Sequence, residues 1–173
     1  LPMNTPTLTP GTVIAERFVI EELAGSGGMS SVYRAYDRRT EQYVAVKILQ
    51  LRTQLPQEVA RFMRESQLLS ELSHPAIVRY IDHGQTESGL PYLVMEWLQG
   101  EDLSVRLRRG PLTIRQSIQL MERITSALAV AHDRGIVHRD IKPNNLFLRG
   151  SQLEGVTLLD FGVARHGITG RMM

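Results

Sequence analysis

The sequence has 173 residues, enough for one domain with a hydrophobic core or for two small lobes, and its formal net charge is +2. Its basic residues are scattered apart from a short cluster at 106–109, which argues against a nucleic-acid-binding surface. It has no cysteine, which excludes disulfides and cysteine zinc sites, and no apolar run approaches the roughly 18 residues of a membrane span, so we expect a cytoplasmic location.

The N-terminal region leads into a glycine-rich hairpin. The chain begins with Leu1 and its last residues carry no terminating feature, so we expect a piece of a longer protein. Residues 1–16 are predicted as a lead-in, because prolines and threonines dominate their first part. Strands are predicted over 18–24 and 32–36, joined by the sequence GSGGMSS. The glycines would let the backbone approach a ligand closely, although a loose hairpin turn would look the same.

A third strand is predicted over 43–49, because its apolar residues alternate. The two predicted faces are Val44, Val46 and Ile48, and Ala45, Lys47 and Leu49. A lysine in such a strand is usually an edge charge that limits aggregation. A ligand-binding lysine is the alternative.

A helix is predicted over 56–72, since proline suits a first turn and the residue before Pro75 avoids the helical conformation. Its apolar face, which contains Phe62 and Leu69, also carries Glu65. A carboxylate on a buried face is costly unless a cation meets it. Arg61, four residues earlier on the helix, is the ordinary surface partner, whereas Lys47 is the better partner for a buried site.

Further strands are predicted over 77–82 and 92–96, which gives a five-stranded antiparallel sheet with one helix. After residue 97 the pattern changes to helices, a short one over 102–109 and a long one that ends at Gly135. The long helix is predicted to pack through one apolar stripe, composed of Ile114, Ile118, Met121, Ile124, Leu128 and Ala131.

The residues with the strongest chemical signal lie in two short stretches. The first reads HRDIKPNN over 138–145, and the second reads DFG over 160–162. The carboxylate of Asp140 could accept a proton from a hydroxyl, while the oxygens of Asn145 and Asp160 could hold a hard cation beside a phosphate. Mg²⁺ is bound in this way, with one or two protein carboxylates and the remaining ligands from water and phosphate.

These stretches, together with Gly25-x-Gly27-x-x-Ser30-x-Val32 and the VAVK sequence at 44–47, resemble the eukaryotic-type (Hanks-type) serine/threonine protein kinases in a bacterial form. Ser30 stands where the family pattern has its third glycine. The resemblance implies an α+β, two-lobed, protein-kinase-like fold. It assigns 17–97 to a five-stranded antiparallel small lobe with one main helix, and 98–173 to an incomplete, mainly helical large lobe. The activation segment stops early, so we expect negligible activity from this piece alone.

The resemblance also implies a role for each site residue. Asp140 would accept the proton of the substrate hydroxyl, Lys142 would balance charge on the transferred phosphoryl group, and Lys47, held by Glu65, would bind the other phosphates of ATP. Mg²⁺, or alternatively Mn²⁺, would be held by Asn145 and Asp160. The remaining nucleotide-binding positions implied are Gly25, Gly27, Val32, Ala45, Glu96, Leu98 and Phe147. His138 is predicted to pack rather than to catalyse.

The expected partners are ATP and proteins phosphorylated on serine or threonine, with a second copy of the chain as a candidate partner and no nucleic acid. The resemblance implies that Arg139 would bind a phosphorylated residue of the activation segment, and Thr169 is the only hydroxyl residue after Asp160 in this sequence. Two other functions stay open, a catalytically inactive nucleotide-binding regulatory module and a small-molecule phosphotransferase of the same fold. Lys47, Asp140 and Asp160 are all retained, which disfavours the inactive module. The HRDxK motif disfavours the small-molecule phosphotransferase.

Overall fold

The computed structural model describes residues 8–27, 30–49 and 56–161, which divide into two compact units. Among these residues, the first unit contains the described part of Leu1–Gln67 together with Tyr80–Trp97. The second contains Leu68–Arg79 together with the described part of Leu98–His166. The predicted small lobe, 17–97, is therefore interrupted by a segment whose contacts lie in the second unit.

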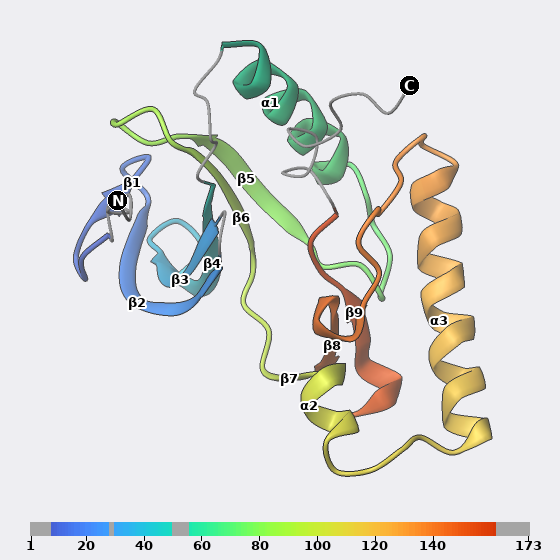
Figure 1. Ribbon diagram of the computed structural model, residues 1–173. Helices are drawn as coiled ribbons and strands as arrows, with labels where there is room; N and C mark the ends of the chain where they lie inside the picture. The colour runs from blue at the N-terminus through green and yellow to red at the C-terminus, as the bar shows by residue number, and fades with distance from the viewer. Residues whose placement is uncertain (1–7, 28–29, 50–55, 162–173) are drawn as a thin grey trace, which may run out of the picture. The chain divides into compact units, whose positions relative to one another are not determined.

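The first unit is built on an antiparallel sheet with the strand order β1-β2-β3-β4-β6-β5 (Figure 1). Its strands are β1 (Val13–Ile14), β2 (Phe18–Gly27), β3 (Ser30–Asp37), β4 (Gln42–Leu49), β5 (Tyr80–Gln85) and β6 (Pro91–Glu96). The sheet has one strand more than predicted, because Val13 and Ile14 of the expected lead-in pair with β2. The helix α1 (Pro56–Ser70) begins at the predicted proline.

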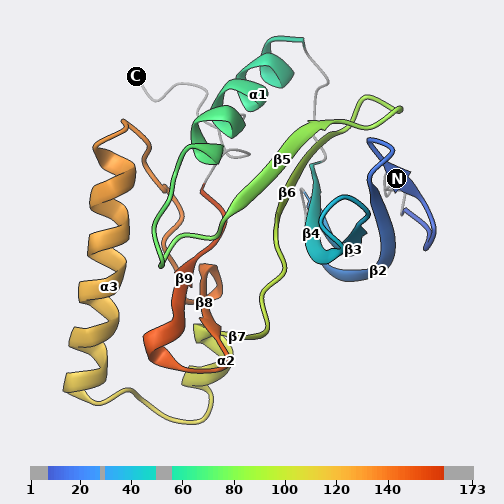
Figure 2. The same cartoon turned by 180° about the vertical axis from the view of Figure 1, so that it is seen from behind.

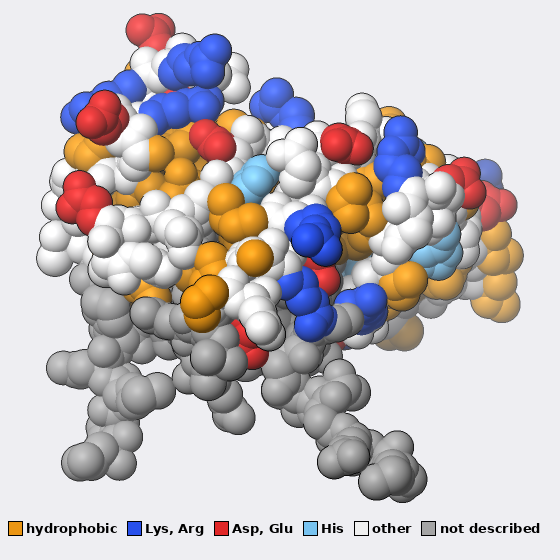
Figure 3. Space-filling model, turned by 90° about the horizontal axis from the view of Figure 1, so that it is seen from above, with side chains coloured by type: hydrophobic (Ala, Val, Ile, Leu, Met, Phe, Trp, Pro, Cys, Tyr) orange, Lys and Arg blue, Asp and Glu red, His pale blue; other side chains and the backbone are white. Residues whose placement is uncertain are grey.

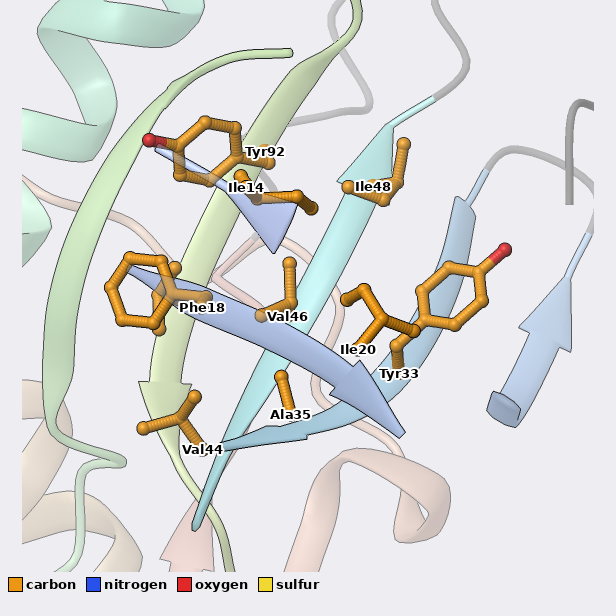
Figure 4. Packing of buried hydrophobic residues seen from close by; sticks show 10 residues of the cluster. Ile14, Phe18, Ile20, Tyr33, Ala35, Val44, Val46, Ile48 and Tyr92 are labelled. Atoms are coloured by element: carbon orange, nitrogen blue, oxygen red, sulfur yellow. The ribbon is translucent and has the colours of Figure 1, made fainter. Parts of the chain in front are cut away.

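The hydrophobic core of this unit lies on one face of the sheet. Side chains from β1, β2, β3, β4 and β6 point toward one another there (Figure 4). The cluster contains Ile14, Phe18, Ile20, Tyr33, Ala35, Val44, Val46, Ile48, Tyr92 and Val94. Val44, Val46 and Ile48 are the face predicted from the alternation, which is confirmed. Lys47 therefore belongs to the opposite face of β4.

A buried ion pair closes one end of this core. Asp37, at the end of β3, is fully buried, and its two carboxylate oxygens accept from Nε and Nη2 of Arg17 at 2.8 and 2.7 Å. Thr40 Oγ1 and the Arg39 backbone N–H donate to the same carboxylate at 2.8 and 2.9 Å. The Arg17 guanidinium, followed by these other donors, holds the pKa of Asp37 well below its usual range. Arg17 Nη1 also lies 3.3 Å from Asp82.

The second unit contains a small antiparallel sheet in the order β7-β8-β9 (Figure 2). Its elements are β7 (Gly100–Asp102), α2 (Leu103–Leu107), α3 (Ile114–His132), the 3₁₀ turn η1 (Pro143–Asn145), β8 (Leu146–Arg149), the 3₁₀ turn η2 (Leu153–Gly155) and β9 (Val156–Leu158). The strand β7 was not predicted. Its residues pair with β8, with Gly100 opposite Arg149 and Asp102 opposite Phe147. No local sequence pattern predicts this pairing.

The strand predicted over 77–82 divides at Tyr80. β5 starts there, whereas Ile77 forms a parallel bridge with Leu158 of β9 in the second unit. The Val78 N–H donates to Leu158 O at 3.0 Å, and the Leu158 N–H donates to Ala76 O at 2.8 Å. Ala76, Ile77 and Val78 are all buried, and this short apolar run pairs with β9 rather than with the large sheet.

The helix α3 carries two apolar faces where one was predicted. Thr113 caps its start through a capping box with Gln116, and Gly135 follows its end with a φ of 70°. Figures 1 and 2 show α3 alongside β9, and its buried residues are Leu120, Ile124, Ala127 and Ala131. The prediction was right for Ile124 and Ala131. Ile114, Ile118 and Met121 of the predicted stripe are instead 81%, 53% and 53% exposed.

These exposed side chains form a second apolar stripe on α3. With Leu112, Ser117, Glu122 and Thr125 they line an open groove of about 480 Å³. We expect the 173-residue chain, expressed alone, to self-associate through this groove, because exposed apolar patches promote association. Light scattering over a concentration series should show the apparent mass rising for the unmodified chain and falling toward the monomer for the double variant Ile118→Glu, Met121→Glu.

The control for this prediction is Leu107→Glu, which places a glutamate at an exposed leucine of α2 outside the groove. Its apparent mass should follow that of the unmodified chain. A monodisperse monomer at every concentration would show that the groove does not drive association.

Charged side chains of both signs are interspersed on the face of the molecule drawn in Figure 3, with uncharged side chains among them. This mixed distribution agrees with the scattered lysines and arginines of the sequence. Within the described ranges, no helix combines the length and apolar composition that crossing a membrane requires.

Candidate active site

In the first unit, three of the predicted nucleotide-binding residues lie in one row across the sheet. Cross-strand pairing places Gly25 opposite Val32, Val32 opposite Lys47, and Lys47 opposite Leu93. Directly opposite residues of an antiparallel pair share a face, so Val32 and Lys47 lie on the face away from the core. Ala45, two residues before Lys47 on β4, lies on this same face.

The glycines of the hairpin are not required by the backbone. Neither Gly25 nor Gly27 has a positive φ, and a Cβ added at Gly25 would meet nothing within 4 Å. At Gly27 the nearest atom would be Ser30 O at 4.0 Å. The fold itself would accept a side chain at Gly25 and at Gly27. Gly28 and Met29 lie outside the described residues.

Glu65 is paired with a different cation from the one predicted. Among the described residues, its carboxylate Oε1 lies 3.3 Å from Arg61 Nε, an i,i+4 pair along α1. Both side chains are partly exposed, 44% for Arg61 and 29% for Glu65. The Lys47–Glu65 pair stays a prediction. The i,i+4 spacing makes the local partner available whatever the position of the helix.

In the second unit, two predicted site residues converge on the carboxylate of a third. Asp140 Oδ2 lies 3.1 Å from Lys142 Nζ, and it accepts from Asn145 Nδ2 at 3.0 Å. The same Asn145 nitrogen also donates to Asp140 O at 2.8 Å. Because the amide nitrogen of Asn145 faces Asp140, its amide oxygen is the end that can ligate a cation.

Leu159 links this cluster to Asp160. Its backbone N–H donates to Asn145 O at 2.9 Å, and its carbonyl oxygen lies 2.7 Å from His138 Nε2. Both peptide groups of the residue before Asp160 are thus fixed against the 138–145 loop. Arg139 and Asp160 adopt φ angles of 64° and 52°, a conformation uncommon for residues other than glycine and typical of functional sites.

His138 has the structural role that was predicted. Its ring is buried and lies 4.7 Å from the Phe161 ring, and its Nδ1 accepts from the Asp140 N–H at 3.3 Å. Burial lowers the pKa of His138 below its ordinary value, so the neutral ring is favoured. A neutral ring with Nδ1 as acceptor and Nε2 as donor joins Asp140 to Leu159.

The chemistry of these side chains fits Mg²⁺. Among the described residues, no group of three or more histidines, aspartates and glutamates could hold a metal ion. Mg²⁺ does not need such a group, because it takes one or two protein oxygens and fills its octahedron with water and phosphate. Asn145 and Asp160 would supply those oxygens. Gly162 and Thr169 lie outside the described residues.

The remaining predicted residues are placed as follows. Glu96 ends β6 opposite Val44, Leu98 begins the second unit, and Phe147 lies in β8 opposite Asp102. Lys47 and Lys142 are the only two lysines of the sequence, whose other basic side chains apart from histidine are arginines. An ammonium is a compact point charge on a flexible stem, whereas the guanidinium of arginine is a planar fork that binds carboxylates and phosphates in a bidentate way.

Sequence reasoning missed Ser104 and Asn144. Asn144 Nδ2 donates to Ser104 Oγ at 3.1 Å, which joins the loop that carries Asn145 to the start of α2. The signal that was available is Asp102, a typical N-cap residue at the start of a predicted helix. It marks where α2 begins and does not show that Ser104 meets Asn144, 40 residues later in the chain.

This fold and site define a two-lobed protein of the kinase-like class, and comparison with known proteins agrees. Residues 18–172 match the protein kinase domain, and the chain belongs to this family. It is 38% identical over 170 residues to serine/threonine-protein kinase pkn3 of Myxococcus xanthus, covering 94% of this chain and 31% of that protein. It is 39% identical over 165 residues to PknB of Mycobacterium tuberculosis, covering 91% and 26%.

A solved structure gives the same result for the fold. The PknI kinase domain of M. tuberculosis superposes with a TM-score of 0.81 at 26% identity, covering 92% of this chain and 63% of that one. The predicted fold class and the predicted likeness to bacterial serine/threonine kinases are confirmed. The chain spans less than a third of the length of the curated relatives named above.

Proposed function

We propose that this chain forms the nucleotide-binding and catalytic part of a serine/threonine protein kinase, which transfers the γ-phosphoryl group of ATP to protein hydroxyls. The single observation that carries this proposal is the convergence of Lys142 and Asn145 on Asp140 Oδ2, at 3.1 and 3.0 Å. A carboxylate, an ammonium and an amide oxygen are thereby gathered within one short loop. A mainly electrostatic catalyst of phosphoryl transfer needs these groups together.

Each residue of the loop has a proposed task. Asp140 accepts the proton of the substrate hydroxyl and orients its oxygen, and Lys142 balances the negative charge that develops on the transferred group. Asn145 offers its amide oxygen, and Asp160 its carboxylate, to Mg²⁺ or Mn²⁺, which neutralises phosphate charge when bound. His138 positions this loop against Leu159 and takes no proton from the substrate.

The residues of the first unit are proposed to hold the nucleotide. Lys47 binds the phosphates that are not transferred, and the backbone at Gly25 and Gly27 covers them, which accounts for two glycines that the fold does not require. Glu65 is proposed to leave Arg61 and pair with Lys47 when nucleotide is bound. The adenine-binding positions are Val32, Ala45, Glu96, Leu98 and Phe147.

We propose 17–97 and 98–173 as the extents of the small and large lobes in the sequence; the two compact units differ from these extents in that Leu68–Arg79 belongs to the second unit. The proposed partners are ATP, proteins with accessible serine or threonine, and a second copy of the chain. A cytoplasmic location is proposed with them, because the reaction consumes ATP and the sequence has no cysteine.

The proposal is tested by phosphoamino-acid analysis of a generic basic protein incubated with the full-length natural protein, ATP and Mg²⁺. We expect phosphoserine and phosphothreonine, because a lysine two residues after the aspartate, as in Lys142 after Asp140, is typical of serine/threonine kinases. Mainly phosphotyrosine would contradict the proposed hydroxyl specificity. Nucleotide binding without any phosphoamino acid would instead support the inactive regulatory module.

A further inference from the structure

We propose that the hydrogen bond between Ser104 and Asn144 positions the catalytic loop by tying it to the N-terminus of α2. The inference deepens the proposed function and rests on it. Ser104 is the second residue of α2, and Asn144 is the middle residue of the turn η1. Their side chains meet at 3.1 Å, and all the residues concerned belong to the second unit.

The donor and the acceptor of each hydrogen bond in the series from Asn144 through Ser104 to Asp102 follow from the chemistry of the side chains. Asp102 caps α2, and its Oδ1 accepts from the Val105 N–H at 3.0 Å and also from the Ser104 hydroxyl. Since Ser104 gives its only proton to a carboxylate, its oxygen must accept from Asn144 Nδ2. A hydroxyl that donates to an anion becomes a better acceptor, so the two bonds strengthen each other.

The Asp102 end of this series of hydrogen bonds is rigidly held. Asp102 is the last residue of β7 and lies opposite Phe147 in the sheet with β8. Asp102 is therefore both the last residue of a paired strand and the N-cap of α2, and both interactions orient Ser104. An anchor on such elements is more precise than one on a free loop.

The other end of this series of hydrogen bonds is the turn η1, which carries Asn145, the proposed metal ligand. The Asn145 N–H donates to Lys142 O at 2.9 Å, which closes η1, and the Asn145 side chain holds Asp140. Asn144 and Asn145 are adjacent residues with separate partners, Ser104 and Asp140. The Ser104 bond fixes the rotation of the turn, and this rotation sets where Asn145 and Asp140 lie.

Loss of the bond should therefore act on rate more than on binding. A displacement of the reacting groups by less than 1 Å can cost up to about a hundredfold in rate. Asn144 is exposed, so a bond that mattered only for stability would contribute little. Ser104 and Asn144 are positioning residues here, because neither is placed in contact with substrate.

The experiment compares Ser104→Ala, Asn144→Ala and the double variant in the full-length protein. We expect kcat to fall about five- to twentyfold with the KM for ATP unchanged, and the double variant to be no worse than the singles. Ser104→Thr keeps the hydroxyl and should restore kcat. Ser117→Ala is the matched control, because Ser117 donates its hydroxyl within α3 to Thr113 O at 3.0 Å and has no contact with the loop.

Hydrogen exchange provides a readout that does not depend on activity. Without nucleotide, the amides of Asn145 and Leu146 should exchange about five- to tenfold faster in Ser104→Ala, while those of α3 keep their wild-type rates. Exchange and kcat that match the Ser117→Ala control, or additive losses in the double variant, would overturn the inference. A wild-type protein without kinase activity would refute the proposed function, whereas the exchange rates would still decide whether Ser104 holds the loop.

Discussion

Replacing Lys47 by methionine or Asp160 by asparagine is expected to lower the rate of phosphoryl transfer on the order of a thousandfold or more. Methionine keeps the length of the Lys47 side chain and removes the charge that is proposed to hold phosphate. Asparagine is chosen for Asp160 because it tolerates the φ of 52° at this position and removes only the carboxylate charge. The folded state should survive in both variants.

The measurement is incorporation of labelled phosphate by the full-length protein, with thermal unfolding as the check on folding. Arg38→Met and Asp133→Asn are the controls, since each makes a comparable change at an exposed position outside the site. ATP with Mg²⁺ should also protect Lys47 from an amine-reactive reagent, which peptide mapping can follow because this chain has one other lysine. Turnover at the wild-type rate in either variant would refute the role assigned to that residue.

Removing the guanidinium of Arg17 is expected to have the largest effect on stability. Arg17→Met leaves the fully buried carboxylate of Asp37 without its cation, while the apolar stem of the side chain is preserved. Breaking a buried pair from one side costs about 3–5 kcal/mol in the free energy of unfolding. Urea unfolding at neutral pH measures this loss. A change no larger than that of an exposed ion pair would show that Thr40 and the Arg39 N–H suffice for Asp37.

The pH dependence gives an independent test of the same pair. The pKa of Asp37 is lower in the folded state than in the unfolded state, so its contribution is present above the unfolded pKa of about 3.9 and is lost as the pH falls below that value. The difference between wild type and Arg17→Met should therefore shrink in acid. The control is Arg109→Met. Arg109 is 55% exposed and forms an ion pair with Glu101, so the loss in the free energy of unfolding should be much smaller.

Much of the first unit could be predicted because its signals are local. The alternation in β4 predicted that Val44, Val46 and Ile48 face the core and that Lys47 does not, since a strand has a side-chain period of two. Pro56 marked the start of α1 because its fixed φ suits a first turn. Asp140, Lys142 and Asn145 lie close together in the 138–145 stretch, and the structure places Lys142 and Asn145 beside the Asp140 carboxylate.

The tertiary structure decided every feature whose partner is distant in sequence. Ile77 reads as the start of a strand, and only the presence of Leu158 beside it assigns it to the second unit. The apolar residues of α3 read as one stripe, because hydrophobicity records that a residue can be buried and not what covers it.

The same distinction applies within the site. From the sequence alone, Glu65 had two candidate cations and the choice fell on the distant one, whereas the structure pairs it with Arg61 on its own helix. The bond from Asn144 to Ser104 had no signal, because a polar side chain can meet any donor or acceptor that the fold brings near it. From the sequence one could read which chemical groups the candidate site contains, because the motifs name them directly. Packing determined which distant groups hold that loop in place, because hydrogen bonds and ion pairs depend on distances that only the folded chain sets.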